Sequence, residues 1–325
     1  MNPKPFTRDL PYSLAIILVA CSGNAIAQDV GCTASARLMR FACTNDLRDS
    51  FYTSTAQCQD SAVFDGGCVE EAQAELDDGE EECSDVFDAR LDLCEALDDA
   101  THEPPFGPAF ASNFVDPTEI GSTITPNPWF PLVPGNRWTY EGEDEQIVVV
   151  VQNRTKLIQG INCLVVTDIV TEEGLLVEDT DDWFAQDVDG NVWYCGEIAE
   201  NYELFEGDDP EVAEFVDIEG SWKSGRDRAK AGMLLPFDPV PGTIIRQEVR
   251  YGDAEDVIEI ESVTATESAP GGACSDACLR TRDFTPLEPE AEENKFYAPG
   301  IGLIVEIDSE TGERVELVEF VGVGS

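Results

Sequence analysis

Three side chains of the kind that binds calcium recur at every second position: Asp187, Asp189 and Asn191. They match positions 1, 3 and 5 of the EF-hand calcium loop, whose ligands are carboxylate and amide oxygens. That loop has glycine at position 6 and glutamate at position 12, whereas this chain has Gly190 at position 4 and Ile198 at position 12. A β-hairpin turn explains the same residues without a metal, because Asp-Gly is a strong turn signal. We expect a hairpin here, with calcium binding as the alternative and no other cofactor.

Residues for nucleophilic catalysis are scarce. The chain has no Gly-x-Ser-x-Gly elbow, and His102 is its only histidine. A pair of carboxylates can hydrolyse a glycosidic bond, but among 67 Asp and Glu residues no pair stands out. The sequence therefore predicts no catalytic residue, and a carboxylate-dependent hydrolase is kept as an alternative.

Four tryptophans could form a ligand-binding wall: Trp138, Trp183, Trp193 and Trp222. They lie in segments with a strand-like pattern, so the simplest interpretation is a hydrophobic core. The alternative is a concave aromatic wall that contacts an apolar or sugar ligand.

The charge is strongly one-sided. Lys and Arg total 19 against 67 Asp and Glu, which gives a net charge of −48. Nucleic acids and anionic membrane surfaces are therefore poor partners, because phosphate contacts need cations. A solvated acidic surface explains the excess, with binding of divalent cations as the alternative. The identity of a partner is not indicated.

Residues 1–27 have the pattern of an export signal: a basic start, then an apolar run at 13–20 that is too short to span a bilayer. Leu-Val-Ala-Cys ending at Cys21 matches the bacterial lipobox, which would make residues 1–20 a lipoprotein signal and lipidate Cys21. Ala-Ile-Ala at 25–27 suits ordinary cleavage equally well. We expect an outer-membrane lipoprotein or a periplasmic or secreted protein, attached to the membrane only through such an anchor.

The cysteines of residues 28–100 predict a stapled helical hairpin. Cys32 and Cys43 are 11 positions apart, as are Cys83 and Cys94. Eleven helical steps of about 100° return to nearly the same face, so each pair marks one helix face. Six cysteines allow 15 connectivities, and antiparallel helices favour one nested scheme. The preferred bonds are Cys32–Cys94, Cys43–Cys83 and Cys58–Cys68. A structural scaffold is favoured over a redox role.

Residues 101–126 contain five prolines among small and polar residues, which indicates an extended linker. His102 lies at its start, and a lone histidine in such a connector is expected to be solvated.

From residue 127 the pattern changes to successive strands without helical periods, which indicates an antiparallel meander over 127–325. The expected strands are 137–142, 146–151, 161–170, 175–188, 220–224, 243–251, 257–264, 278–284, 295–297 and 301–319. The fold class is thus α+β, with a small disulfide-stapled helical hairpin followed by a half-barrel or barrel-like β-meander.

A two-residue type I′ turn at Asp189-Gly190 would pair Val188 with Asn191. The faces of that hairpin follow from this register. Phe184, Trp193 and Cys195 would share one face, and Trp183, Val192 and Tyr194 the other.

Four cysteines remain in the β region, and proximity in sequence would pair Cys163 with Cys195 and Cys274 with Cys278. Two strand spacings, roughly 9.5 Å, would separate the first two cysteines, and four extended residues, about 13 Å, the second two. Both distances exceed the reach of a disulfide. We therefore predict the bonds Cys163–Cys278 and Cys195–Cys274.

Several motifs resemble a family of uncharacterised exported bacterial proteins, and the likeness covers nearly all of residues 127–320. They are NPWFPL (127–132), DWFAQD (182–187), DGNVWY (189–194), TRDFTPLEP (281–289) and YAPGIGL (297–303). The family implies no activity. More loosely, the last motif is similar to the closing hairpin of periplasmic half-barrels of the lipoprotein-carrier type. That similarity implies a curved sheet around a hydrophobic hollow, and hence ligand binding.

Together these features predict a non-catalytic exported protein that binds a ligand or acts as a scaffold. A calcium-dependent surface module is the first alternative and a carboxylate-dependent hydrolase the second. A cavity lined by apolar groups and at least two convergent carboxylates would favour the hydrolase.

Overall fold

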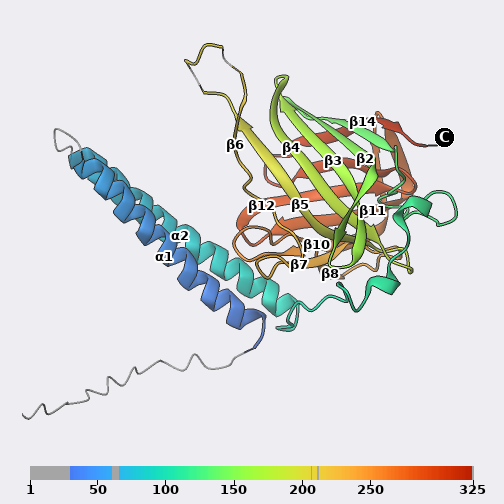
Figure 1. Cartoon of the computed structure of the whole chain (residues 1–325), viewed down its shortest axis with the longest axis horizontal. Helices are drawn as coiled ribbons and strands as arrows, with labels where there is room; N and C mark the ends of the chain where they lie inside the picture. The colour runs from blue at the N-terminus through green and yellow to red at the C-terminus, as the bar shows by residue number, and fades with distance from the viewer. Residues whose placement is uncertain (1–29, 61–65, 206, 211, 324–325) are drawn as a thin grey trace, which may run out of the picture.

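Two long helices and a curled antiparallel sheet make up the chain (Figure 1). The computed structural model describes residues 30–60, 66–205, 207–210 and 212–323. The expected export signal and Cys21 lie outside these residues. Within them, no helix combines the length and the apolar character that crossing a membrane requires.

Helix α1 (Cys32–Gln59) and helix α2 (Gly66–Ala96) form an antiparallel hairpin that projects from the sheet (Figure 1). Three disulfides staple it: the two pairs that the 11-residue spacing favours and the remaining pair, all as expected. The bonds, with their Cα–Cα distances, are Cys32–Cys94 (5.3 Å), Cys43–Cys83 (5.9 Å) and Cys58–Cys68 (5.8 Å). The helices approach closely at Gly79, where an added Cβ would lie 2.4 Å from a methyl carbon of Leu47.

A buried ion pair attaches the hairpin to the sheet. Arg90 of α2 donates to both carboxylate oxygens of Glu255, at 3.0 and 2.5 Å. At the base of the hairpin, the Arg246 guanidinium lies 2.7 Å from the sulfur of Cys32. The two parts therefore contact each other directly.

The sheet contains 14 strands among the described residues, and its strand pairings are antiparallel, as the meander predicts. The strands are β1 (Arg137–Glu141), β2 (Glu145–Ile158), β3 (Ile161–Glu172), β4 (Leu175–Gln186), β5 (Val192–Glu203), β6 (Glu214–Asp217), β7 (Lys230–Leu235), β8 (Ile244–Arg246), β9 (Glu248–Val249), β10 (Val257–Ala269), β11 (Gly272–Thr285), β12 (Glu288–Ala298), β13 (Gly302–Asp308) and β14 (Arg314–Val321). The strand expected at 220–224 forms only a single bridge, between Gly196 and Lys223.

The order of the strands brings the two ends of the sheet together. It runs β8-β10-β11-β12-β13-β14-β1-β2-β3-β4-β5-β7-β9, with β6 beside β5. The outermost strands, β8 and β9, are separated in sequence only by Gln247. The sheet therefore curls until its ends meet, and its inner face surrounds a core that includes Trp138, Phe184 and Leu317.

The hairpin between β4 and β5 forms as expected, but its predicted register is wrong by one residue. Asp187 pairs with Asn191 around a three-residue loop, and Gly190 adopts a φ of 91° at its end. Three-residue loops of this kind usually combine a type I turn with a left-handed glycine. Because one residue changes the face of every side chain, Phe184 stacks on Tyr194 rather than sharing a face with Trp193 and Cys195.

The predicted bonds Cys163–Cys278 and Cys195–Cys274 are also wrong: Cys163 bonds Cys195 across β4, with a Cα–Cα distance of 6.8 Å. Trp183 pairs with Gly196 and Phe184 with Tyr194, so Cys195 is the extra residue of a β-bulge. A bulge bends its strand, which brings Cys195 closer to Cys163 than a flat sheet would.

Cys274 bonds Cys278 on the same strand, with a Cα–Cα distance of 5.3 Å. Between them β11 advances four residues while its partner β10 advances only two, from Ala265 to Glu267. Asp276 takes a left-handed φ of 52° in this bulge. The strand coils locally, so the distance expected for an extended chain does not apply.

The proline-rich segment 101–126 packs on the sheet instead of acting as a free linker. Phe106 and Phe114 contact the ring of Trp193. His102, expected to be solvated, is partly buried, and its Nε2 lies 2.8 Å from the carbonyl oxygen of Ala231.

Candidate functional site: an acidic cavity inside the sheet

The inner face of the sheet surrounds a cavity of about 620 Å³. One part of its wall is apolar and aromatic, and the rest carries carboxylates. The apolar part includes Phe130, Trp138, Tyr140, Val149, Phe184 and Leu303. The acidic part contains Asp168, Glu178, Asp182, Glu197, Asp256, Asp283 and Glu306, together with Lys295.

Four of these carboxylates come from three neighbouring strands, and we call Asp168, Glu178, Asp182 and Glu197 the acid cluster. Asp182 of β4 pairs with Val166 of β3 and with Glu197 of β5. Asp168 lies two residues beyond Val166, and Glu178 lies four residues before Asp182. Side chains two residues apart on a strand share a face, so the register directs all four carboxylates inward.

Tyr194 links two members of the acid cluster. Its hydroxyl oxygen lies 2.5 Å from Asp182 and 2.7 Å from Glu197. A tyrosine has one hydroxyl proton and can donate to only one of them. The second short contact requires that the other carboxyl is protonated and donates to the tyrosine oxygen. The geometry thus describes two carboxyls and a tyrosine that share protons.

Burial raises the pKa of three carboxyls of the acid cluster, those of Asp182, Glu197 and Asp168. Burial raises the pKa of Asp182 to about 7. The hydrogen bond from Tyr194 lowers this pKa, and the charge of Glu178 raises it. Burial and the charge of Asp182 raise the pKa of Glu197 well above its usual value. Burial, with Asp182 and Glu178, does the same for Asp168. These groups repel one another as anions.

Asp168 has an oxygen without a partner. Its buried Oδ1 accepts no hydrogen bond from any described residue. No Lys or Arg of the described chain forms an ion pair with a member of the acid cluster. A buried carboxylate oxygen without a donor is unfavourable by about 1–3 kcal/mol or more, so this position suits a donor from outside the chain.

Lys295, by contrast, forms ion pairs with Asp283 and Glu306 in the other acidic part of the wall. Its Nζ lies 3.1 Å from Glu293, 3.1 Å from Glu306 and 3.7 Å from Asp283. Burial lowers the pKa of Lys295, but the three carboxylates outweigh burial and raise it well above its usual value. Burial raises the pKa of Asp283 to about 6, although Lys295 opposes the rise. This cluster shows how an ammonium group is held in the same cavity.

The structure separates the four tryptophans that could have formed one wall. Only Trp138 lines the cavity, and its Nε1 donates to Ile301 at 2.6 Å. Trp183 and Trp222 line a hollow outside the cavity, where the ammonium of Lys156 lies 3.4 Å from the centre of the Trp183 ring. Trp193 lines a third pocket. A single aromatic wall of these four residues is therefore wrong.

The calcium candidates serve the hairpin turn. The carboxylate of Asp187 accepts from the backbone of Asp189 and Asn191, both at 2.9 Å. It also accepts from the side chains of Asn191 at 2.9 Å and Trp193 at 2.8 Å. Asn191 uses its own oxygen to accept from the backbone of Phe237. In the described chain no three His, Cys, Asp or Glu side chains are grouped so that they could hold a metal ion.

The sequence did carry a signal for the acid cluster. Asp168 shares its strand face with Val166 and Val170, and Asp182 shares its face with Phe184. Charged residues at positions that share a face with core residues indicate a polar interior. The signal depends on the register, which the sequence did not determine.

Comparisons with known proteins add no relative: no family model, curated protein or solved structure matches this chain.

Proposed function

We propose that this chain is an exported binding protein whose cavity takes a small organic cation with an apolar body. The observation that carries the proposal is the contrast between the two acidic parts of the wall. One holds the ammonium of Lys295, whereas the acid cluster has no cation and leaves Asp168 Oδ1 without a donor. A ligand ammonium would supply that cation.

The apolar part of the wall supports an organic cation. Phe130, Trp138 and Phe184 line the same cavity as the acid cluster. Aromatic rings attract ammonium groups, and they also pack against apolar parts of a ligand. A cavity of about 620 Å³ falls within the usual range for small-molecule sites. The preferred ligands are therefore primary amines with an aromatic or aliphatic body.

Calorimetry with 2-phenylethylamine and its neutral analogue 2-phenylethanol tests the proposal. The amine should bind at least about tenfold more tightly, because a charged hydrogen bond contributes about 1.5–3 kcal/mol. The affinity for the amine should rise with pH through about 7, as Asp182 loses its proton. Equal binding of amine and alcohol at pH 8 would contradict the proposal.

Paired variants locate the site. Asp168→Asn and Asp182→Asn should each weaken amine binding about tenfold or more. Asp181→Asn is the matched control, because Asp181 is adjacent to Asp182 but pairs with Arg154 outside the cavity. If Asp181→Asn weakens binding as much as Asp182→Asn does, the effect comes from overall charge and not from the cavity.

The convergence of carboxylates favours a hydrolase as a second candidate. Asp182 and Glu197 share protons through Tyr194, and a protonated carboxyl beside an ionised one can act as acid and base. Incubation with nitrophenyl esters and glycosides tests this. Turnover that is lost in Glu197→Gln supports catalysis, whereas amine binding without turnover in any of these assays supports the binding protein.

We place the protein outside the cytoplasm. Five disulfides among the described residues suit an oxidising compartment, and residues 1–27 have the sequence pattern of an export signal. If Cys21 carries a lipid, Cys21→Ser should move the protein from the detergent fraction to the aqueous one. A mature N-terminus at Gln28 would instead show ordinary secretion.

A further inference from the structure

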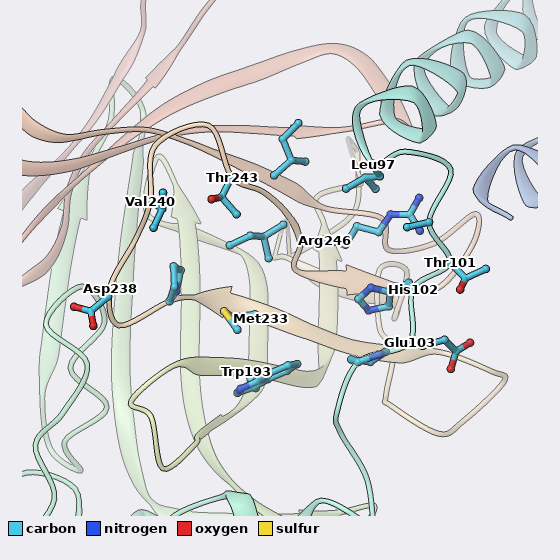
Figure 2. Close-up of a pocket in the computed structure, with 15 residues that line it drawn as sticks. Leu97, Thr101, His102, Glu103, Trp193, Met233, Asp238, Val240, Thr243 and Arg246 are labelled. Carbon is cyan, nitrogen blue, oxygen red and sulfur yellow. The ribbon is translucent and has the colours of Figure 1, made fainter.

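The pocket lined by Trp193, of about 440 Å³, lies where the connector that follows α2, from Leu97 onward, meets the outside of the sheet (Figure 2). Most of its lining is aliphatic or aromatic, including Leu97, Trp193, Met233, Val240, Ile244 and Ile245. Figure 2 shows Arg246 and His102 at one end of the pocket and Asp238 and Val240 at the other. The pocket is thus an apolar hollow with a cation at one end.

This pocket is separate from the acidic cavity. Trp193 lines it, whereas the next residue, Tyr194, lines the cavity. In the same way, Arg246 lines the pocket and the next residue, Gln247, lines the cavity. Successive residues of a strand point to opposite faces, so the pocket and the cavity lie on opposite sides of the sheet and have no lining residue in common.

Arg246 is the unusual group in the pocket. Its exposed fraction is 9%, and the only hydrogen-bond contact of its guanidinium with the described residues is the 2.7 Å approach to the sulfur of Cys32. A guanidinium carries five N–H donors, and a disulfide sulfur is a weak acceptor. The other buried arginine of the described chain, Arg90, has a carboxylate partner. Arg246 has none, in a chain with 67 acidic residues.

The neighbouring groups leave that charge unmatched. His102 donates from Nε2 to the carbonyl of Ala231. Burial lowers the pKa of His102, and the charges of Arg246 and Lys230 lower it further. The ring therefore stays neutral at neutral pH. Glu103 is paired with Lys230 at 2.7 Å, and Asp238 lies at the far end of the pocket (Figure 2).

We propose that this pocket binds a monocarboxylate with an aliphatic tail. The carboxylate would accept two parallel hydrogen bonds from Arg246, a geometry that the planar guanidinium favours. The tail would lie against Met233, Val240 and Ile244, where its burial adds affinity. Because Leu97 and His102 belong to the connector, the ligand would contact both the hairpin base and the sheet.

Calorimetry with decanoate and decanol tests this assignment. Decanoate should bind at least about tenfold more tightly than decanol, and Arg246→Met should remove that preference. Equal binding of the two compounds to the wild-type protein overturns the proposal, as does a failure of decanoate to bind. Asp168→Asn should leave decanoate binding unchanged, because Asp168 lines the other cavity.

A second variant keeps the test decisive if Arg246→Met does not fold. Val240 is 63% exposed, so Val240→Glu should fold normally while placing an anion in the pocket. It should weaken decanoate binding about tenfold or more. Val321→Glu, at an exposed position of β14 that lines neither site, adds the same charge and should leave binding unchanged. Equal effects of the two variants would show that decanoate does not occupy the pocket.

Discussion

The helical hairpin and the sheet are stabilised in different ways. In the hairpin, the buried residues of α1 are only Cys32, Ala36 and Cys58, so disulfides provide much of what holds the helices together. The sheet buries a continuous core with large side chains such as Trp138 and Leu317. Of its two disulfides, one joins β3 to β5 and the other lies within β11, and both are in strands that are already packed.

This difference shows where covalent bonds matter. A two-helix hairpin cannot bury enough apolar surface to be stable alone, whereas a curled sheet of 14 strands can. The two parts are also easy to observe separately. All five tryptophans lie between residues 129 and 222, so tryptophan fluorescence reports on the sheet, and helical circular dichroism reports on the hairpin.

The largest expected effect comes from the ion pair that joins the two parts. Glu255→Ala should reduce the free energy of unfolding by about 3–5 kcal/mol, because it leaves Arg90 buried without its partner. Hydrogen exchange should increase in α2 near Arg90 and around Gly252, whose backbone also donates to Glu255. The double variant Arg90→Met/Glu255→Leu should recover most of the loss. If Glu255→Ala melts like the wild type, the pair does not hold the hairpin in place.

Removal of a hairpin disulfide should be nearly as damaging and should act locally. Cys43 and Cys83 are 40 residues apart, and closing such a loop contributes about 4 kcal/mol in the chain-entropy model. Cys43→Ser/Cys83→Ser should lower the melting temperature seen by helical circular dichroism and leave that of tryptophan fluorescence almost unchanged. Equal shifts by both probes would show that the hairpin and the sheet unfold as one unit.

Within the sheet, the two disulfides should differ from each other. Cys163 and Cys195 are 32 residues apart, whereas Cys274 and Cys278 are four apart. The same model gives contributions of about 4 and about 2 kcal/mol. Serine at both positions of each pair, followed by urea unfolding monitored by fluorescence, measures the difference. Loss of the Cys274–Cys278 bond would be the more destabilising of the two only if the packing of the coiled bulge at Asp276 depended on that bond.

These two parts also explain what the sequence could predict. The helical hairpin depends on a local period, so the matching spacings of Cys32 and Cys43 and of Cys83 and Cys94 were enough to favour the bonds Cys32–Cys94 and Cys43–Cys83. The pairing of strands depends on loop length and bulges, and a change of one residue around Gly190 reversed the faces of the hairpin. The bulge at Cys195 and the coil at Asp276 have no comparable sequence signal, which is why the β-domain disulfides were predicted wrongly.

The candidate site was missed for the same reason. Asp168 and Asp182 converge only when the register of β3, β4 and β5 is known. Trp138 was the one candidate that reached the cavity. Asp168 and Asp182 do share strand faces with core residues, but among 67 acidic residues that signal identifies the inward carboxylates only once the register is known.

The smallest effect expected is a pH dependence confined to the sheet. The folded pKa of Asp182 is about 7, against an ordinary value of 3.8. The folded state therefore holds this proton more tightly than the unfolded state does. The resulting stability is fully present below about pH 4 and is lost as pH rises through about 7. The melting temperature from tryptophan fluorescence should fall between about pH 5 and pH 8, and Asp182→Asn should flatten that fall, because the amide does not titrate. Addition of 2-phenylethylamine should raise the melting temperature more at pH 8 than at pH 5, since its ammonium group needs the ionised carboxylates. A melting temperature that rises with pH, in the wild type and in Asp182→Asn alike, would show that the acid cluster does not hold protons in the folded protein.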